Sequence, residues 1–334
     1  MKKIIALFLI SVMMIVSCTG CGQGLIGNSS DKITVVCTMF SQYDWTKQVV
    51  GNNENIEIIL LGDTGVDMHS FQPSADDIIT ISDCDVFIYG GGLSDSWVED
   101  ILAEATNEEM IVINMMETLG DNLKEEEFVE GMQDSEEHDH DHEAEETEHD
   151  NDYAQYDEHV WLSINNAMVI CDRICQVMSQ IDADNKDIYK ENLDRYMMEL
   201  ENLDSLYAQM ASSSQCNTVL FGDRFPYIYM MRDYNIEYYA AFSGCSADAE
   251  ASFETVTFLA KKIDELNIPV VLVEKGSNRD LAQTIIDSTT AKNQTILEMN
   301  SMQSMTKEQL DAGESYISIM QDNLEILKQA LGCQ

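Results

Sequence analysis

The chain has 334 residues and a formal charge of −43, because 61 acidic side chains stand against 18 basic ones. So negative a charge argues against binding to nucleic acid or to anionic lipid head groups and makes cations the natural partners. The length allows one large or two medium domains with a substantial buried core.

Residues 1–17 predict an export signal. Lys2 and Lys3 precede an apolar run over residues 4–16 that is short for a membrane span. Residues 15–18 are similar to the lipobox of bacterial lipoproteins, so we predict lipidation at Cys18. Cys21 is the alternative, although a cysteine then takes the place of the usual aliphatic residue.

The stretch 18–31 is polar and contains glycine, which predicts a tether between a lipid anchor and the folded domain. Later apolar segments are too short to span a membrane. We therefore expect a protein that is anchored by lipid to the extracytoplasmic face of the cell membrane and otherwise soluble.

Apolar runs and helical patterns alternate through the segment 32–164, which predicts an N-terminal β/α lobe with a mostly parallel sheet. The predicted strands are 33–39, 56–61, 85–89 and 110–114, and the predicted helices are 44–50, 74–82 and 97–105.

An acidic insert, residues 134–158, carries four of the six histidines, and a fifth, His159, follows it directly. Imidazole nitrogens beside carboxylate oxygens are a ligand mixture suited to zinc and its neighbours. A solvated acidic linker is the simpler alternative, but charge alone does not account for so many histidines. We predict a weak auxiliary metal collector with the ligands His138, His140, His142 and His149.

Two helical stretches follow in the segment 165–212, and the second is long enough to link two lobes. The β/α alternation then restarts in the segment 213–334, with strands predicted at 218–221, 237–241, 270–273 and 295–299 and helices at 226–233, 253–267, 280–289 and 316–331. The predicted fold class is therefore α/β, with two β/α lobes and a helical spine. Most of the cysteines, Cys245 included, are interpreted as small core residues or left without a role.

Candidate ligands stand where predicted strands end, which is where open α/β sheets bind their ligands. His69 lies in the loop after the strand 56–61, Asp223 follows 218–221, and Glu274 closes 270–273. His159 precedes a helix whose predicted N-cap is Ser163. Each alone is as easily a surface group, a cap or a salt-bridge partner, but together they predict a cation site between the lobes.

Two motifs carry a resemblance to a known family. Asp67-Met68-His69-Ser70-Phe71-Gln72-Pro73 and Asp157-Glu158-His159-Val160-Trp161-Leu162-Ser163 resemble the first two ligand motifs of the zinc- and manganese-binding lipoproteins of ABC importers. The resemblance covers nearly the whole mature chain, and the insert stands where zinc-binding members carry a His-rich loop.

The resemblance implies two lobes joined rigidly by a long helix, with the metal between them. It also implies a binding protein rather than an enzyme, which captures Zn²⁺ through His69 and His159 and delivers it to an ABC permease and its ATPase. A monomer is expected.

The second half of the site departs from the family pattern. A third histidine, or a glutamate in manganese binders, is usual after the first strand of the C-terminal lobe, but this chain has Asp223 and Arg224 there. The fourth ligand is often an acid after the last strand, where this chain has Asn300 and Gln303, and amides bind zinc poorly. Asp223 and Glu274 are the predicted substitutes; a water or a histidine of the insert stays open, as does simple pairing of Asp223 and Arg224 with neighbours.

Three alternatives remain at this stage. Two histidines with two carboxylates also suit manganese or iron. An exported metalloenzyme would use an open zinc position, but the run from His142 lacks the second histidine of HExxH, and no Gly-x-Ser-x-Gly is present. An adhesin or a metal sensor would bind the ion without a transporter.

Overall fold

The computed structural model describes residues 32–62, 65–133, 155–245 and 251–333. The chain divides into two units, Met1–Lys32 and Ile33–Gln334, and all the helices and strands below belong to the second. The predicted signal peptide, Cys18, Cys21, the tether and the four histidines of the insert lie outside the described residues. Within the described ranges, no helix is both long and apolar enough to cross a membrane.

The N-terminal lobe is built on a parallel sheet in the order β2-β1-β3-β4. Parallel strands covered on both faces need apolar side chains in both directions. Accordingly, Val35 packs into a core on one face, and its neighbour Val36 packs into a second core on the other. The strands are β1 (Ile33–Cys37), β2 (Ile56–Leu60), β3 (Val86–Tyr89) and β4 (Ile111–Asn114), and the helices are α2 (Phe40–Val50), α3 (Ala75–Asp83), α4 (Val98–Ala103) and α5 (Met115–Leu119).

The C-terminal lobe repeats this plan with a parallel sheet in the order β6-β5-β7-β8. Leu220 and Phe221 again point into different cores. The strands are β5 (Thr218–Phe225), β6 (Glu237–Ser243), β7 (Val270–Glu274) and β8 (Thr295–Met299), and the helices are α8 (Ile228–Asp233), α9 (Phe253–Leu266), α10 (Asp280–Ser288), α11 (Lys307–Asp311) and α12 (Tyr316–Ala330).

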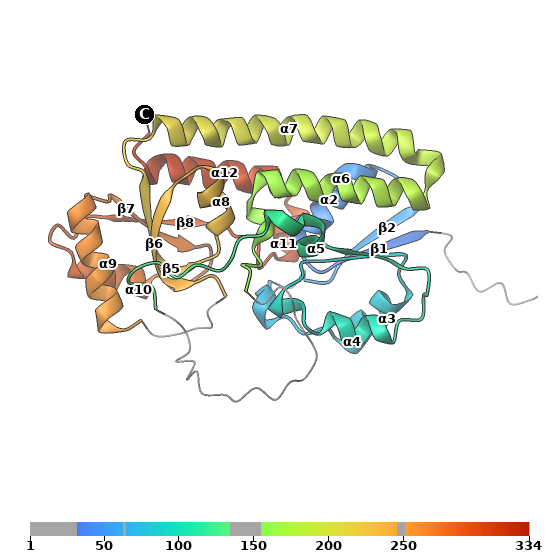
Figure 1. The fold of residues 1–334 in the computed structure, drawn as a ribbon, viewed down its shortest axis with the longest axis horizontal. Helices are drawn as coiled ribbons and strands as arrows, with labels where there is room; N and C mark the ends of the chain where they lie inside the picture. Colours follow the sequence, from blue (N-terminus) through green and yellow to red (C-terminus); the bar gives the residue numbers. More distant parts are fainter. Residues whose placement is uncertain (1–31, 63–64, 134–154, 246–250, 334) are drawn as a thin grey trace, which may run out of the picture. The chain divides into compact units, whose positions relative to one another are not determined.

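Two long helices, α6 (Ile164–Ile181) and α7 (Lys186–Ser213), connect the lobes (Figure 1). Helix α7 packs on α6, on α2 of the first lobe and on α12 of the second. The side chain of Asn192 donates to the carbonyl of Val49 in α2, and the hydroxyl of Tyr207 donates to the carbonyl of Met320 in α12. Both lobes and α7 share one continuous core cluster, so α7 fixes the two lobes against each other.

The predicted fold class of two parallel-sheet α/β lobes is confirmed. The predicted boundaries of the lobes and of the helical region stay predictions. The short helices α5 and α11, which have five residues each, were not predicted, because one helical turn has no readable periodicity.

One predicted strand end was wrong. Strand β5 does not stop at Phe221 but continues to Phe225, with a shift of register against β6 between Phe221 and Arg224. An irregularity of this kind absorbs an extra residue without ending the strand. Asp223 therefore lies inside the strand and not in a loop beyond it.

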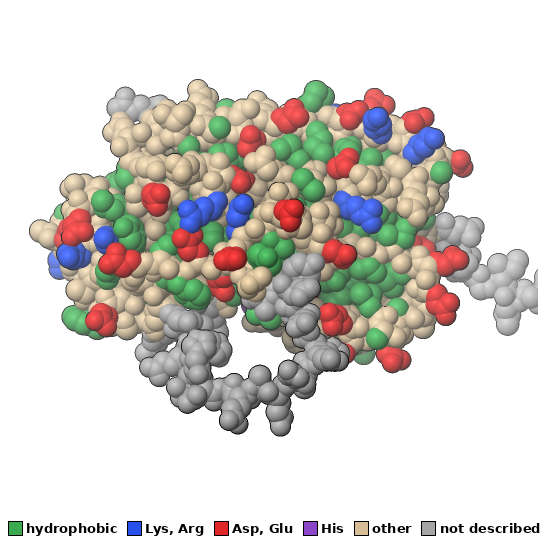
Figure 2. All heavy atoms as spheres, viewed as in Figure 1, with side chains coloured by type: hydrophobic (Ala, Val, Ile, Leu, Met, Phe, Trp, Pro, Cys, Tyr) green, Lys and Arg blue, Asp and Glu red, His purple; other side chains and the backbone are tan. Residues whose placement is uncertain are grey.

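The acidic side chains are spread over the face of the molecule drawn in Figure 2, with basic side chains among them. Much of the negative charge of the described residues thus solvates the surface.

Candidate metal centre

His69 lies on the 3₁₀ turn Met68–Ser70, which follows β2. The carboxylate of Asp67 caps this turn by accepting a hydrogen bond of 3.0 Å from the backbone N–H of His69. The ring nitrogen Nδ1 lies 2.8 Å from the hydroxyl of Ser94 and 3.1 Å from a carboxylate oxygen of Glu158. These contacts hold the Nδ1 edge of the ring and leave Nε2 available to a ligand.

His159 is fully buried at the start of the turn before α6. Both its backbone N–H and its Nδ1 lie within 3.1 Å of Asp157 Oδ1, so one carboxylate sets the backbone and the ring together. A carboxylate at Nδ1 keeps the proton there and leaves the lone pair on Nε2. Ser163 caps α6 by accepting from the N–H of Asn166, which confirms the predicted N-cap.

The two imidazoles meet with their Nε2 atoms 3.2 Å apart. Two neutral lone pairs this close repel each other, so the pair favours a proton or a metal cation between them. Burial opposes the charged form of His159, but the charges of Asp157, Glu158 and Glu274 outweigh it and raise the pKa of this histidine. The structure therefore brings both predicted histidines into one place with the electrostatics of a cation site.

Cys245 completes a group that sequence analysis did not find. The ligand atoms of His69, His159 and Cys245 all lie within 4.8 Å of one another, and this is the group of metal-type ligands found among the described residues. Cys245 stands just beyond the carboxyl end of β6, and its thiol lies 3.4 Å from a carboxylate oxygen of Glu158. Burial, and then the charge of Glu158, raise the pKa of this thiol, so it stays protonated without a cation.

Gly244 allows the end of β6 to approach so closely. A Cβ at this position would lie 2.7 Å from the Cε1 atom of His159, too short for a real contact. The sequence signal that could have found Cys245 is the same strand-end rule that found Asp223, applied to β6 instead of β5.

Asp223 and Glu274 do not join the group. The guanidinium of Arg224 lies 2.8 Å from Asp67 and 2.9 Å from Glu274, and the other carboxylate oxygen of Glu274 accepts from the hydroxyl of Ser301. Asp223 accepts a hydrogen bond of 3.4 Å from the backbone of Glu274. The alternative of pairing with neighbours thus describes Arg224, and the ligand roles of Asp223 and Glu274 stay predictions.

These charged residues line an open cleft of about 950 Å³ beside the histidines. Its walls include Asp67 from the first lobe and Asp223, Arg224 and Glu274 from the second. Both lobes therefore contribute charge to the approach to the imidazoles.

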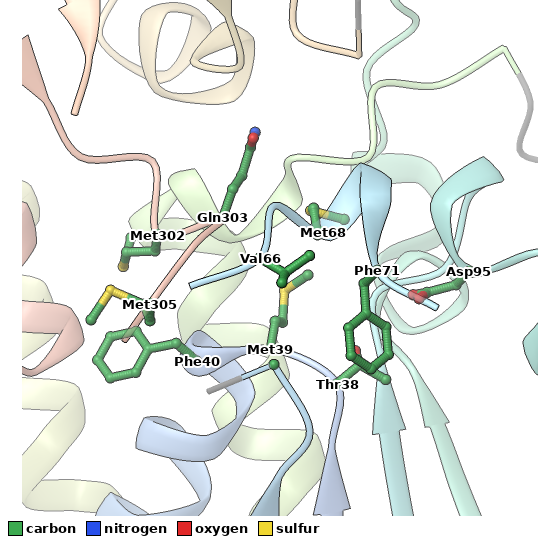
Figure 3. A pocket seen from close by; sticks show the side chains of 11 residues that line it. Thr38, Met39, Phe40, Val66, Met68, Phe71, Asp95, Met302, Gln303 and Met305 are labelled. Atoms are coloured by element: carbon green, nitrogen blue, oxygen red, sulfur yellow. The ribbon is translucent and has the colours of Figure 1, made fainter. Parts of the chain in front are cut away.

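Asn300 and Gln303 have different surroundings. The side chain of Asn300 accepts from the N–H of Met302, and its backbone exchanges hydrogen bonds with Asn323, so Asn300 holds the loop after β8. The buried amide of Gln303 makes no hydrogen bond within the described ranges. It lines a cavity of about 20 Å³, room for roughly one water, among four methionines (Figure 3): Met39, Met68, Met302 and Met305.

The described residues on either side of the segment 134–154 lie next to the centre. The backbone N–H of Gln133 donates to the carbonyl of Ala241 in β6, the strand that leads to Cys245. At the other side, Tyr156 forms a bridge with Glu125 and is followed directly by Asp157 and the centre itself.

Two parallel-sheet lobes joined by a long helix, with donor atoms from both lobes in one cluster, define a solute-binding protein of the metal-binding class. The family model described as zinc-uptake complex component A, periplasmic (ZnuA), matches residues 35–330, and the chain belongs to this family.

Several relatives have been characterised. The chain is 29% identical over 330 residues to the zinc-binding lipoprotein AdcA of Streptococcus pneumoniae (strain ATCC BAA-255 / R6), covering 98% of this chain and 61% of AdcA, so it spans about three fifths of that relative. It is 28% identical over 333 residues to the high-affinity zinc uptake system protein ZnuA of Bacillus subtilis (strain 168), covering 99% and 98% of the two chains. These relatives are named as zinc-binding and zinc-uptake proteins and not as enzymes, which confirms the predicted class.

Solved structures show the same fold. The Zn(II)-bound ZnuA-like domain of Streptococcus pneumoniae AdcA superposes with a TM-score of 0.68 at 27% identity, over 90% of this chain and 99% of that domain. The metal-dependent lipoprotein YcdH of Bacillus subtilis superposes with a TM-score of 0.70 at 26% identity, again over 90% and 99%.

Proposed function

We propose that this protein is the extracytoplasmic zinc-capturing component of an ABC importer, which holds Zn²⁺ between its lobes and delivers it to a membrane permease driven by an ATPase. The observation that carries the proposal is the pair of Nε2 atoms 3.2 Å apart, on rings that are each oriented by a carboxylate at Nδ1. Membership of the zinc-uptake family supports the choice of zinc.

His69 and His159 act as neutral nitrogen ligands in this proposal. Zinc binds imidazole nitrogen at about 2.0–2.1 Å, and carboxylates behind the rings raise the basicity of the ligating nitrogen. Glu158 and Asp157 are these carboxylates, and Glu274 adds negative charge that the buried His159 senses. Protons compete with zinc for the same nitrogens, so the affinity for zinc falls as the pH drops through the histidine range.

The acidic insert acts as an accessory collector. His138, His140, His142 and His149 bind ions weakly and transiently, and the described flanks of this segment lie beside the centre. Lipidation at Cys18 keeps the monomeric protein on the extracytoplasmic face of the membrane; the lipobox-like residues 15–18 and the lipoprotein names of relatives support this part.

Competition titration of zinc and manganese on the protein without its signal tests the proposal. We expect tight zinc binding that survives deletion of residues 134–152 and is lost in His69→Ala. His149→Ala, which removes a histidine of the insert, is the matched control and should bind zinc as tightly as the parent. Loss of all tight binding on deletion of the insert would instead make that segment the functional site.

A further inference from the structure

We propose that Cys245 is the third ligand of the captured cation, so that the centre is a two-histidine, one-thiolate site that selects zinc and other thiolate-binding divalent ions over manganese. The inference deepens the proposed function and rests on it. It assigns to Cys245 of the second lobe the role that sequence analysis gave to Asp223.

The geometry places the sulfur where a third ligand belongs. Tetrahedral zinc with nitrogen ligands at about 2.0–2.1 Å and sulfur at about 2.3 Å separates its ligand atoms by roughly 3.3–3.6 Å. The three ligand atoms of His69, His159 and Cys245 already lie within 4.8 Å of one another. Shifts of about 1 Å or less therefore convert the observed cluster into a coordination sphere.

The surrounding chain is shaped for this approach. Gly244 has no side chain at the point where any Cβ would collide with the ring of His159, and so the backbone before Cys245 rests against that imidazole. A cysteine that served only to fill the core would not need its neighbour to make way for a histidine ring.

The other donors of the second lobe are engaged elsewhere. Glu274 uses one oxygen on Arg224 and the other on Ser301, and Asp223 is turned toward the backbone of β7. Recruiting Glu274 would leave the guanidinium of Arg224 with one partner fewer in a partly buried position, whereas recruiting Cys245 breaks only the contact of a neutral thiol with Glu158.

Binding exchanges a proton for the metal. The S–H bond of Cys245 breaks, a metal–sulfur bond forms and the proton passes to solvent, with no change in oxidation state. Thiolate favours zinc, cadmium and cobalt over manganese, which prefers oxygen ligands. The centre would therefore discriminate against manganese by the chemistry of its ligands.

Spectroscopic titration with Co²⁺ and with Cd²⁺ tests the assignment, because thiolate ligation gives a ligand-to-metal charge-transfer band that imidazole and carboxylate do not give. The protein is used without its signal and with the four insert histidines replaced by alanine, under a reductant. We expect one band per protein molecule. Cys245→Ser should abolish the band and weaken zinc binding by about tenfold or more, equivalent to ~1.4 kcal/mol.

The control is Cys216→Ser, because the thiol of Cys216 is also partly exposed but lies against the backbone of Thr218. This variant should keep the band and the affinity. Cys245→Ala is measured beside Cys245→Ser, with circular dichroism to confirm that both fold.

Three outcomes separate the claims. Loss of the band in both Cys245 variants, with the control unchanged, supports the assignment. Tight zinc binding that depends on His69 but leaves the Cys245 variants unaffected overturns the assignment and leaves the proposed function intact. Absence of tight zinc binding in the parent protein overturns both.

Discussion

The N-terminal half of the metal centre is built from local contacts, whereas the C-terminal half is built from contacts between distant parts of the chain. Asp67 and Asp157 each accept the N–H of a histidine two residues ahead, so a short motif carries both the ligand and its support. Arg224, in contrast, pairs with Asp67 across 157 positions and with Glu274 across 50. A local motif can be recognised in a sequence, and a distant pairing depends on the register of whole strands.

Replacement of His159 should have the largest effect on this comparison. We expect His159→Ala to reduce zinc affinity by more than about 100-fold, equivalent to ~2.7 kcal/mol, because one of two rigid imidazole ligands is lost. Competition titration measures the change, and His142→Ala is the control. An affinity within a few fold of the parent would show that the local half does not hold the ion.

Asp95 tests whether the local half carries an electrostatic cost. Burial, partly offset by the N–H of Gly91, raises the pKa of Asp95 to about 7. Between the unfolded pKa near 4 and this value the unfolded state binds fewer protons than the folded state. The free energy of unfolding should therefore fall as the pH rises from about 4 to 7, by up to ~4 kcal/mol.

Asp95→Asn should remove most of this fall. Urea unfolding at several pH values measures it, with Asp85→Asn as a control at another carboxylate that bonds a backbone N–H. The same slope in the parent and in Asp95→Asn would contradict the prediction.

Arg224 tests the non-local half. Arg224→Gln leaves Asp67 and Glu274 without their shared cation, and we expect the free energy of unfolding without metal to fall by about 1–3 kcal/mol, because these carboxylates are only partly exposed. Thermal unfolding measures the loss. The control, Arg279→Gln, removes an exposed pair with Glu298 and should cost less than about 1 kcal/mol. Equal losses in both variants would argue that Arg224 does not join the lobes.

Asp157 sharpens the account of ligand orientation and has the smallest expected effect. Asp157→Asn keeps the size of the side chain but removes the charge behind His159, and zinc affinity should fall about 10-fold or somewhat more. Asp172→Asn, an exposed acid on α6, is the control and should have no effect. An unchanged affinity in Asp157→Asn would mean that packing alone orients the imidazole.

The two halves also differ in how far the sequence could predict them. The eight strands, the long helix and both histidines followed from apolar runs, helical spacing and local motifs. Asp223 was placed beyond a strand that in fact continues through it, since Gly222 looks like a strand end and the irregularity in β5 leaves no mark in one sequence. Cys245 was passed over because one cysteine among nine has no distinguishing pattern until β6 brings it beside His159.

Zinc X-ray absorption spectroscopy on the protein loaded with one equivalent of zinc, with the insert histidines replaced by alanine, tests the central claim most directly. The account predicts a zinc shell that contains two imidazole nitrogens and one sulfur, and that loses one imidazole in His69→Ala. A shell of oxygen atoms without imidazole would contradict the claim that the facing histidines hold the ion.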